Sequence, residues 1–109
     1  MRRVVAITGG SAGIGRAIAI RLARDGASVA ICARRRERLD GVAAEIIQAG
    51  GTSLPIVADV TRDSEMQAFV DQTVSRWGQL DVMVCNAGYG VYGTIDQIAP
   101  EKMRARAHN

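Results

Sequence analysis

The sequence predicts an α/β fold in which a parallel sheet lies between helices on both of its faces. Short apolar segments alternate with segments of helical periodicity along most of the 109 residues. Strands that alternate with helices in this way form parallel sheets with right-handed crossovers. A hydrophobic content of 48% is enough for one buried core, so residues 1–109 are expected to form one domain or part of one.

The first strand and the first helix are predicted near the amino terminus. The segment VVAIT (Val4–Thr8) is apolar on both faces and rich in β-branched residues, which is typical of a strand buried between two helical layers. Ile14, Ile18 and Leu22 then recur at helical spacing. This helix should end near Gly26, because glycine is favoured in the left-handed conformation that closes a helix.

Two more pairs of strand and helix follow. SVAICA (Ser28–Ala33) predicts the second strand, and the segment Arg35–Ala49 predicts the second helix. SLPIVA (Ser53–Ala58) predicts a third strand at an edge of the sheet, because its proline lacks a backbone donor for one of the two neighbours. The third helix is predicted over Ser64–Trp77.

The fourth strand is predicted over Leu80–Cys85, and the segment Tyr89–Asn109 predicts a loop followed by a helix that begins near Pro100. The expected strand order is 3-2-1-4, which leaves the fourth strand as an uncovered edge. We therefore expect residues 1–109 to be a domain that is incomplete at its carboxyl end, either a truncated or frameshifted product or part of a longer protein.

Charge, hydropathy and cysteine content exclude several classes of function. A net charge of +3 is too small to predict nucleic-acid binding, and no apolar segment approaches the ~18 residues of a membrane span. The amino terminus has no secretory pattern, so we expect a cytoplasmic protein with neither a membrane nor a nucleic acid as partner. Cys32 and Cys85 lack zinc-ligand spacing and belong to strands ~9–10 Å apart, beyond disulfide reach, so both should be reduced and buried.

The segment TGGSAGIG (Thr8–Gly15) places four glycines between the first strand and the first helix. The backbone N–H groups at a helix amino terminus attract phosphate, and they are accessible only where no Cβ atom intervenes. Gly9 would permit the tight turn, Gly13 the approach of a pyrophosphate, and Gly15 the packing of the helix on the sheet. This pattern predicts a dinucleotide site of the Rossmann type, and the alternative is a turn that binds nothing.

Three motifs together resemble the amino-terminal half of the classical short-chain dehydrogenase/reductases. TGGSAGIG, ADV (Ala58–Val60) and CNAG (Cys85–Gly88) follow the first, third and fourth predicted strands in the order typical of that family. The resemblance covers residues 1 to about 103. One position departs from it, because Cys85 stands where the family usually has asparagine.

The resemblance implies a role for each matched residue. The backbone of the glycine turn would hold the pyrophosphate, with Ser11 near the adenosine ribose and the N–H of Ile14 on the phosphates. Asp59 would accept a hydrogen bond from the adenine amino group, and Val60 would flank that ring. Alternatively, Asp59 caps a helix and the asparagine of CNAG forms a turn. The residues that would line the path to the nicotinamide ribose are Asn86, Ala87 and Gly88.

The end of the second strand predicts the choice of cofactor. An acidic side chain there would bind a ribose 2′-hydroxyl and repel a 2′-phosphate, but this sequence has Ala33, followed by RRRER. Arginine side chains form paired hydrogen bonds to phosphate. We therefore expect NADP(H) to be preferred over NAD(H), with Arg34 as the main ligand of the 2′-phosphate and Arg35 as the second. Arg36 and Arg38 are expected to point into solvent.

The catalytic residues of the resembled family have no counterpart in this sequence. In that family a Tyr-x-x-x-Lys segment and a serine assist hydride transfer between nicotinamide and a carbonyl or alcohol carbon, whereas neither Tyr89 nor Tyr92 precedes a lysine at that spacing. Asn109 lies close to the position of an asparagine of the family's proton relay. We expect the cofactor-binding half of an NADP(H)-dependent oxidoreductase that is homo-oligomeric at full length. The alternatives are an inactive nucleotide-binding fragment and, on the arginine run alone, a nucleic-acid binder.

Overall fold

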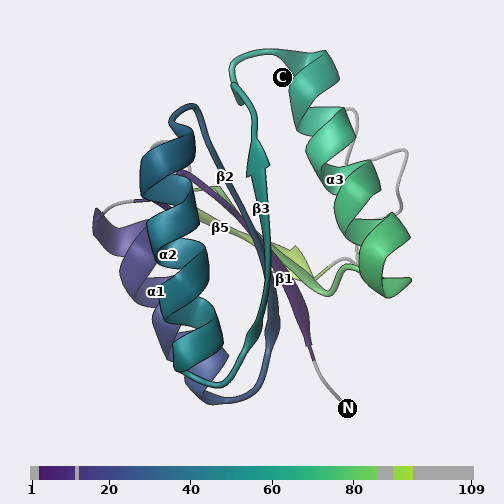
Figure 1. Ribbon diagram of the computed structural model, residues 1–109. Coiled ribbons are helices and arrows are strands. Elements are labelled where there is room, and N and C mark those ends of the chain that lie inside the picture. The colour runs from purple at the N-terminus through teal and green to yellow at the C-terminus, as the bar shows by residue number, and fades with distance from the viewer. Residues whose placement is uncertain (1–2, 12, 86–89, 95–109) are drawn as a thin grey trace.

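A five-stranded sheet forms the centre of the molecule. The computed structural model describes residues 3–11, 13–85 and 90–94 (Figure 1). Helices α1 and α2 cover one face of the sheet and α3 covers the other. The elements, in chain order, are β1 (Val4–Thr8), α1 (Gly13–Arg24), β2 (Ser28–Ala33), α2 (Arg36–Gln48), β3 (Thr52–Val57), α3 (Asp63–Trp77), β4 (Val82–Cys85) and β5 (Gly90–Thr94).

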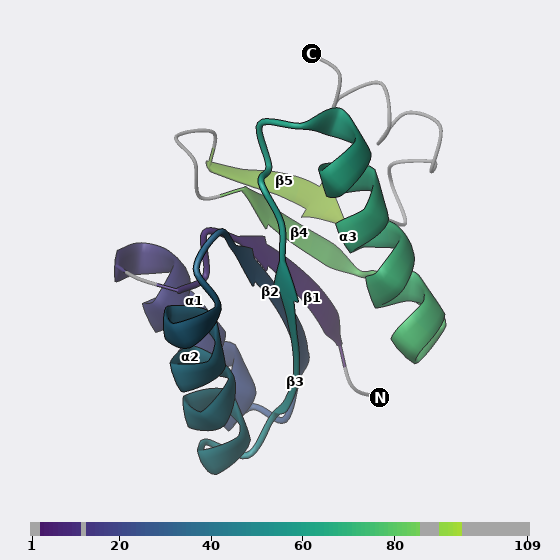
Figure 2. The same cartoon turned by 45° about the horizontal axis from the view of Figure 1, so that its top comes forward.

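The first four strands are parallel in the order β3-β2-β1-β4, which confirms the predicted topology (Figure 2). Right-handed crossovers through the helices return the chain to the same end of the sheet after each strand. Thr8 aligns with Cys32 of β2 and with Cys85 of β4, so the three strands end at the same level. This alignment brings the loops that follow the strands together at one edge.

The segment after β4 differs from the sequence-based expectation. Residues 90–94 were predicted to be a loop, but they form β5, which pairs antiparallel with β4, so β4 is not the edge strand. An unpaired strand edge presents a row of free N–H and C=O groups, and a short connection can supply only an antiparallel partner, because a parallel one needs a long crossover. The prediction of an uncovered fourth strand was therefore wrong for the described residues.

Two apolar clusters hold the helices on the sheet. Because side chains alternate along a strand, Val5 and Ile7 face α1 and α2, whereas Val4 and Ala6 face α3. All five residues of β1 are buried, as the prediction of a strand between two helical layers requires. Phe69 of α3 is the largest fully buried side chain.

The apolar stripes of α1 and α3 are only partly buried. The side chain of Ile14 in α1 is 69% exposed, and that of Val74 in α3 is 40% exposed. In the described part of the chain α3 is alone on its side of the sheet, so the flank of its apolar stripe has no neighbouring helix. Pro55 lies in β3, which pairs only with β2, and its predicted edge position is confirmed.

Candidate nucleotide-binding site

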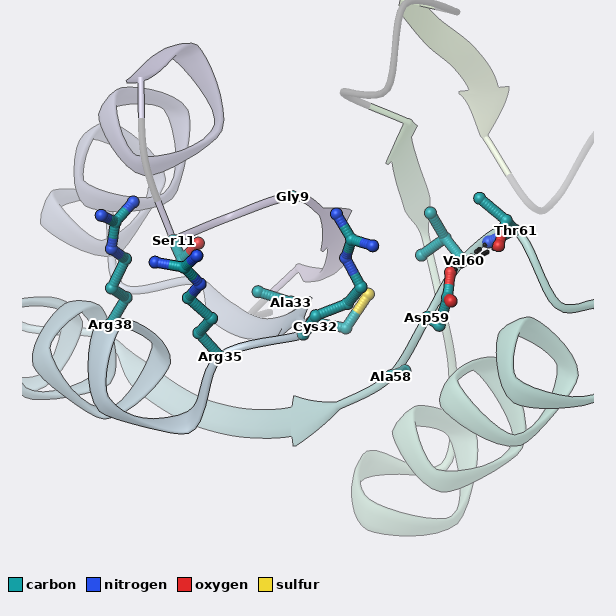
Figure 3. Close-up of a pocket in the computed structure, with 11 residues that line it drawn as sticks. Gly9, Ser11, Cys32, Ala33, Arg35, Arg38, Ala58, Asp59, Val60 and Thr61 are labelled. Carbon is teal, nitrogen blue, oxygen red and sulfur yellow. Dashed lines mark hydrogen bonds between the residues drawn. The ribbon is translucent and has the colours of Figure 1, made fainter.

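A cavity of about 680 Å³ opens at the carboxyl ends of β1, β2 and β3 (Figure 3). In open parallel sheets, ligands bind at this edge, beside the point where the strand order reverses. In this sheet the order reverses at β1, because β2 and β3 lie on one side of it and β4 lies on the other. Three loops, after β1, after β2 and after β3, supply the residues that line the cavity.

The loop after β1 is fixed to the end of β2. The N–H groups of Gly9 and Gly10 both donate to the carbonyl oxygen of Cys32, at 2.9 and 3.4 Å. Gly9 has a φ of 66°, consistent with the tight turn predicted for it. Ser11 is half-buried and lines the cavity together with Gly9.

Helix α1 begins at this loop with an unobstructed backbone. Gly13 has a φ of 59°, which other L-residues rarely adopt, and a Cβ atom built there would have no neighbour within 4 Å. The first N–H groups of a helix have no acceptor within the helix, so an anion can approach them at this point. The side chain of Ile14 is 69% exposed and leaves the approach open, whereas Gly15 is buried.

The loop after β2 carries the positive charge of the site. Arg34, Arg35 and Arg38 line the cavity, and within the described part of the chain none of them has a carboxylate within 4.0 Å. Arg36 instead pairs with Asp40 across one turn of α2, at 3.5 Å. Arg36 and Arg38 are both exposed to solvent, as expected, but Arg38 also lines the cavity, which the sequence analysis did not anticipate.

The loop after β3 forms the opposite wall with a fixed carboxylate. Asp59 accepts hydrogen bonds at Oδ1 from the hydroxyl of Thr61 (2.6 Å) and from its backbone N–H (3.0 Å). These bonds, with smaller contributions from Arg34 and Arg62, hold the pKa of Asp59 below its ordinary value, so it stays ionised at neutral pH. Oδ2 lies 4.0 Å from Nε of Arg62, and Val60 lines the cavity beside it.

Cys32 contributes to the lining of the cavity, while its side chain is fully buried in the core. Burial raises the pKa of this thiol to about 12, so it is a neutral apolar group. Cys32 and Cys85 are both free and buried, as predicted. In the described part of the chain no group of three or more His, Cys, Asp or Glu side chains could hold a metal ion.

Several predicted site residues lie outside the described residues, namely Asn86, Ala87, Gly88 and Asn109. The sequence analysis also missed the role of Thr61, which lines the cavity, and the tight packing of Gly10 within the glycine turn. Gly10 packs so tightly that a Cβ atom there would lie 2.8 Å from Ile31 Cγ2, and Thr61 anchors the predicted adenine ligand. The motif itself offered a clue to Gly10, as the second glycine of TGG, and the spacing Asp-x-Thr is typical of a turn closed by an aspartate side chain.

A parallel sheet in this order, with a glycine turn at the start of α1 and a cavity at the carboxyl ends of its strands, is the arrangement typical of nucleotide-binding α/β proteins. The family model described as short chain dehydrogenase matches residues 3–108, and the chain belongs to this family. Proteins of the family bind NAD or NADP.

Individual relatives agree with this assignment. An uncharacterised oxidoreductase of Methylorubrum extorquens is 37% identical over 103 residues, which are 94% of this chain and 42% of that protein. The crystal structure of a short chain dehydrogenase from Mycobacterium thermoresistibile superimposes with a TM-score of 0.76 at 37% identity, over 94% of this chain and 39% of the other. For the NADH-dependent reductase A1-R′ in complex with NAD the TM-score is 0.74 at 35% identity, over 80% of this chain and 36% of the other.

This chain spans less than half of the length of each of these three proteins. The described helices also include none with the length and apolar character needed to cross a membrane.

Proposed function

We propose that this chain is the cofactor-binding half of an NADP(H)-dependent oxidoreductase that transfers hydride between nicotinamide and a carbonyl or alcohol carbon. The observation that carries the proposal is the wall formed by Arg34, Arg35 and Arg38, three cations that face one cavity without a carboxylate partner among the described residues. Ala33 precedes them at the end of β2, where an acidic residue would favour NAD(H).

The electrostatics support a phosphate on this wall. Arginines gathered near the start of α2 repel one another and face the positive end of the helix dipole, and a bound dianion would replace both repulsions by attraction. A ribose 2′-hydroxyl carries no charge and offers no such gain. In this proposal Arg34 is the main ligand of the 2′-phosphate and Arg35 the second.

The other walls fit the remaining parts of the cofactor. The backbone from Gly9 to Gly15 would hold the pyrophosphate, with Ser11 beside the adenosine ribose. Oδ2 of Asp59 would accept a hydrogen bond from the adenine amino group, because Oδ1 already accepts two hydrogen bonds from Thr61. Val60 would flank the ring, and the residues assigned to the nicotinamide side are Asn86, Ala87 and Gly88.

Hydride transfer itself needs residues that this sequence does not supply. A nicotinamide cofactor supplies or accepts the hydride when it is bound, but a proton donor must act on the substrate oxygen, and the sequence contains no Tyr-x-x-x-Lys segment. We therefore assign catalysis, the carbonyl or alcohol substrate and homo-oligomer formation to a longer form, and we propose the cytoplasm as its location. The second candidate function, a nucleotide-binding fragment without catalysis, rests on the same absence.

Fluorescence titration of NADPH and NADH tests the proposal. The chain should bind NADPH more tightly, and Arg34→Ala should weaken NADPH about ten-fold while it changes NADH by less than about two-fold. Arg24→Ala is the matched control, because Arg24 is exposed in the last turn of α1 and does not line the cavity. Equal affinity for both cofactors, or NADPH affinity unchanged in Arg34→Ala, would overturn the proposed preference.

A further inference from the structure

We propose that Arg38 is a specificity-determining residue that binds the cofactor's 2′-phosphate together with Arg35. This inference rests on the proposed function and extends it to a side chain in the first turn of α2. It begins from the position of Arg38, which is exposed to solvent and yet lines the cavity.

The helix places Arg38 and Arg35 on one face. Arg35 is the residue before α2 and Arg38 lies three positions later, a spacing that puts two side chains next to each other. In Figure 3 the guanidinium groups of both residues lie on the same side of the cavity as Ser11, whereas Asp59, Val60 and Thr61 occupy the opposite side. Ser11 belongs to the loop that the proposed function assigns to the ribose and pyrophosphate.

Arg34 interacts electrostatically with the opposite wall of the cavity, which includes Asp59. Its charge contributes to the lowered pKa of Asp59, the residue proposed to bind adenine. Arg34 can therefore serve both the adenine and the ribose phosphate, while Arg35 and Arg38 are available for the phosphate alone. Two arginines in addition to Arg34 could bind the phosphate oxygens that point toward Ser11.

The charges on α2 distinguish Arg38 from its neighbour Arg36. Asp40 lies four residues after Arg36 and pairs with it, at 3.5 Å. The residues three and four positions after Arg38 are Gly41 and Val42. The residues three and four positions before it are Arg35 and Arg34. Arg38 thus has like charges and no acidic residue at these four positions, and an anion in the cavity would supply a counter-charge.

The experiment compares two small ligands that differ only in the phosphate, adenosine 2′,5′-bisphosphate and 5′-AMP, by isothermal titration calorimetry. Arg38→Ala should weaken the bisphosphate about ten-fold, as expected for one charge-assisted hydrogen bond, and change 5′-AMP by less than about two-fold. The loss of bisphosphate affinity in Arg38→Ala should be smaller at high salt, because the interaction is solvent-exposed and therefore screened. Arg38→Lys should restore part of the lost affinity, since it keeps the charge and loses the paired donors.

Arg36→Ala is the matched control, with the same charge change two positions away on a side chain that does not line the cavity. It should leave both affinities unchanged. A bisphosphate affinity equal in Arg38→Ala and wild type, or an equal loss in Arg36→Ala, would overturn the role of Arg38 alone. A wild-type chain that binds the bisphosphate no more tightly than 5′-AMP would overturn the NADP(H) proposal and the role of Arg38 with it.

Discussion

Thr61 donates two hydrogen bonds to the carboxylate of Asp59, one from its hydroxyl at 2.6 Å and one from its backbone N–H at 3.0 Å. The backbone N–H of Asp59 in turn donates to Oε1 of Glu65 at 2.8 Å. The loop after β3 is therefore fixed from both sides, and the carboxylate is oriented before any ligand arrives. A preoriented group loses less conformational entropy on binding than a mobile one.

Thr61→Val should weaken adenine-nucleotide binding through Asp59. Valine keeps the shape of the side chain and removes the shorter of the two hydrogen bonds, so the pKa of Asp59 should rise toward its ordinary value. We expect the affinity for 5′-AMP to fall about three-fold at neutral pH. The pKa is measured by following the Asp59 carboxyl carbon by NMR, and the affinity by calorimetry.

Thr61→Ser is the control, because serine retains the hydroxyl and should behave as the wild type. The sign of the pH effect follows from the direction of the shift: a carboxyl whose pKa is lowered by folding stabilises the protein above its unfolded pKa. This contribution is lost as pH falls through the folded pKa. The stabilities of Thr61→Val and wild type should therefore converge in acid, and a constant difference across that range would contradict the assignment.

The sequence was sufficient to predict the four parallel strands of the sheet because they are local and strongly patterned. Val4–Thr8 and Ser28–Ala33 are apolar on both faces, and both strands have the predicted bounds. The glycine turn is predictable for a related reason: a positive φ and an open approach at Gly13 are properties of the residue itself. The positions of Cys32 and Cys85 followed from the predicted strand order alone.

The features that sequence analysis missed depend on which groups lie next to each residue in the folded structure. Arg36 and Arg38 are chemically identical, and only the pairing of Arg36 with Asp40 and the position of the cavity separate them. The strand at residues 90–94 was missed because it forms by pairing with the edge of β4. Local sequence patterns do not encode such tertiary pairing.

Gly10→Ala should destabilise the fold by about 1–3 kcal/mol, the usual cost of forcing extra volume into a packed core. The added Cβ atom would lie 2.8 Å from Cγ2 and 3.0 Å from Cβ of Ile31. Ile31 is fully buried in β2, between two other strands, and has little freedom to move. The free energy of unfolding is measured by urea denaturation followed by circular dichroism.

Gly41→Ala provides a matched comparison, because a Cβ atom there would have no neighbour within 4 Å and the residue lies inside α2. Alanine is the better helix former, so this variant should gain up to about 1 kcal/mol. A Gly10→Ala variant as stable as the wild type would show that β2 yields at Ile31.

Cys32 should be unreactive toward thiol reagents in the folded chain. With a pKa of about 12, only about one thiol in ten thousand is ionised at pH 8, and the side chain is 0% exposed. Burial also raises the pKa of Cys85, so both thiols should react only after unfolding. Titration with a chromogenic disulfide in native buffer and in urea measures this, and rapid native labelling of either cysteine would contradict it.

The same shift predicts a loss of stability in alkali. An unfolded thiol ionises near pH 8.5, whereas the folded Cys32 thiol stays protonated until about pH 12. Between these values the unfolded state releases a proton that the folded state retains, so stability falls as pH rises. Cys32→Ala should flatten this part of the profile, and an unchanged alkaline slope in that variant would assign the loss to other groups.

Ala33→Asp should reverse the preference between the two cofactors. Ala33 is half-buried at the end of β2 and lines the cavity directly before the arginines, so a carboxylate there would face the ribose. It would repel a 2′-phosphate and accept a hydrogen bond from a 2′-hydroxyl, and we expect NADPH affinity to fall about ten-fold or more while NADH affinity rises. Ala33→Asn has nearly the same volume without the charge and should retain more of the NADPH affinity. If the two variants lose NADPH equally in fluorescence titration, the effect is steric and the electrostatic account of this wall is wrong.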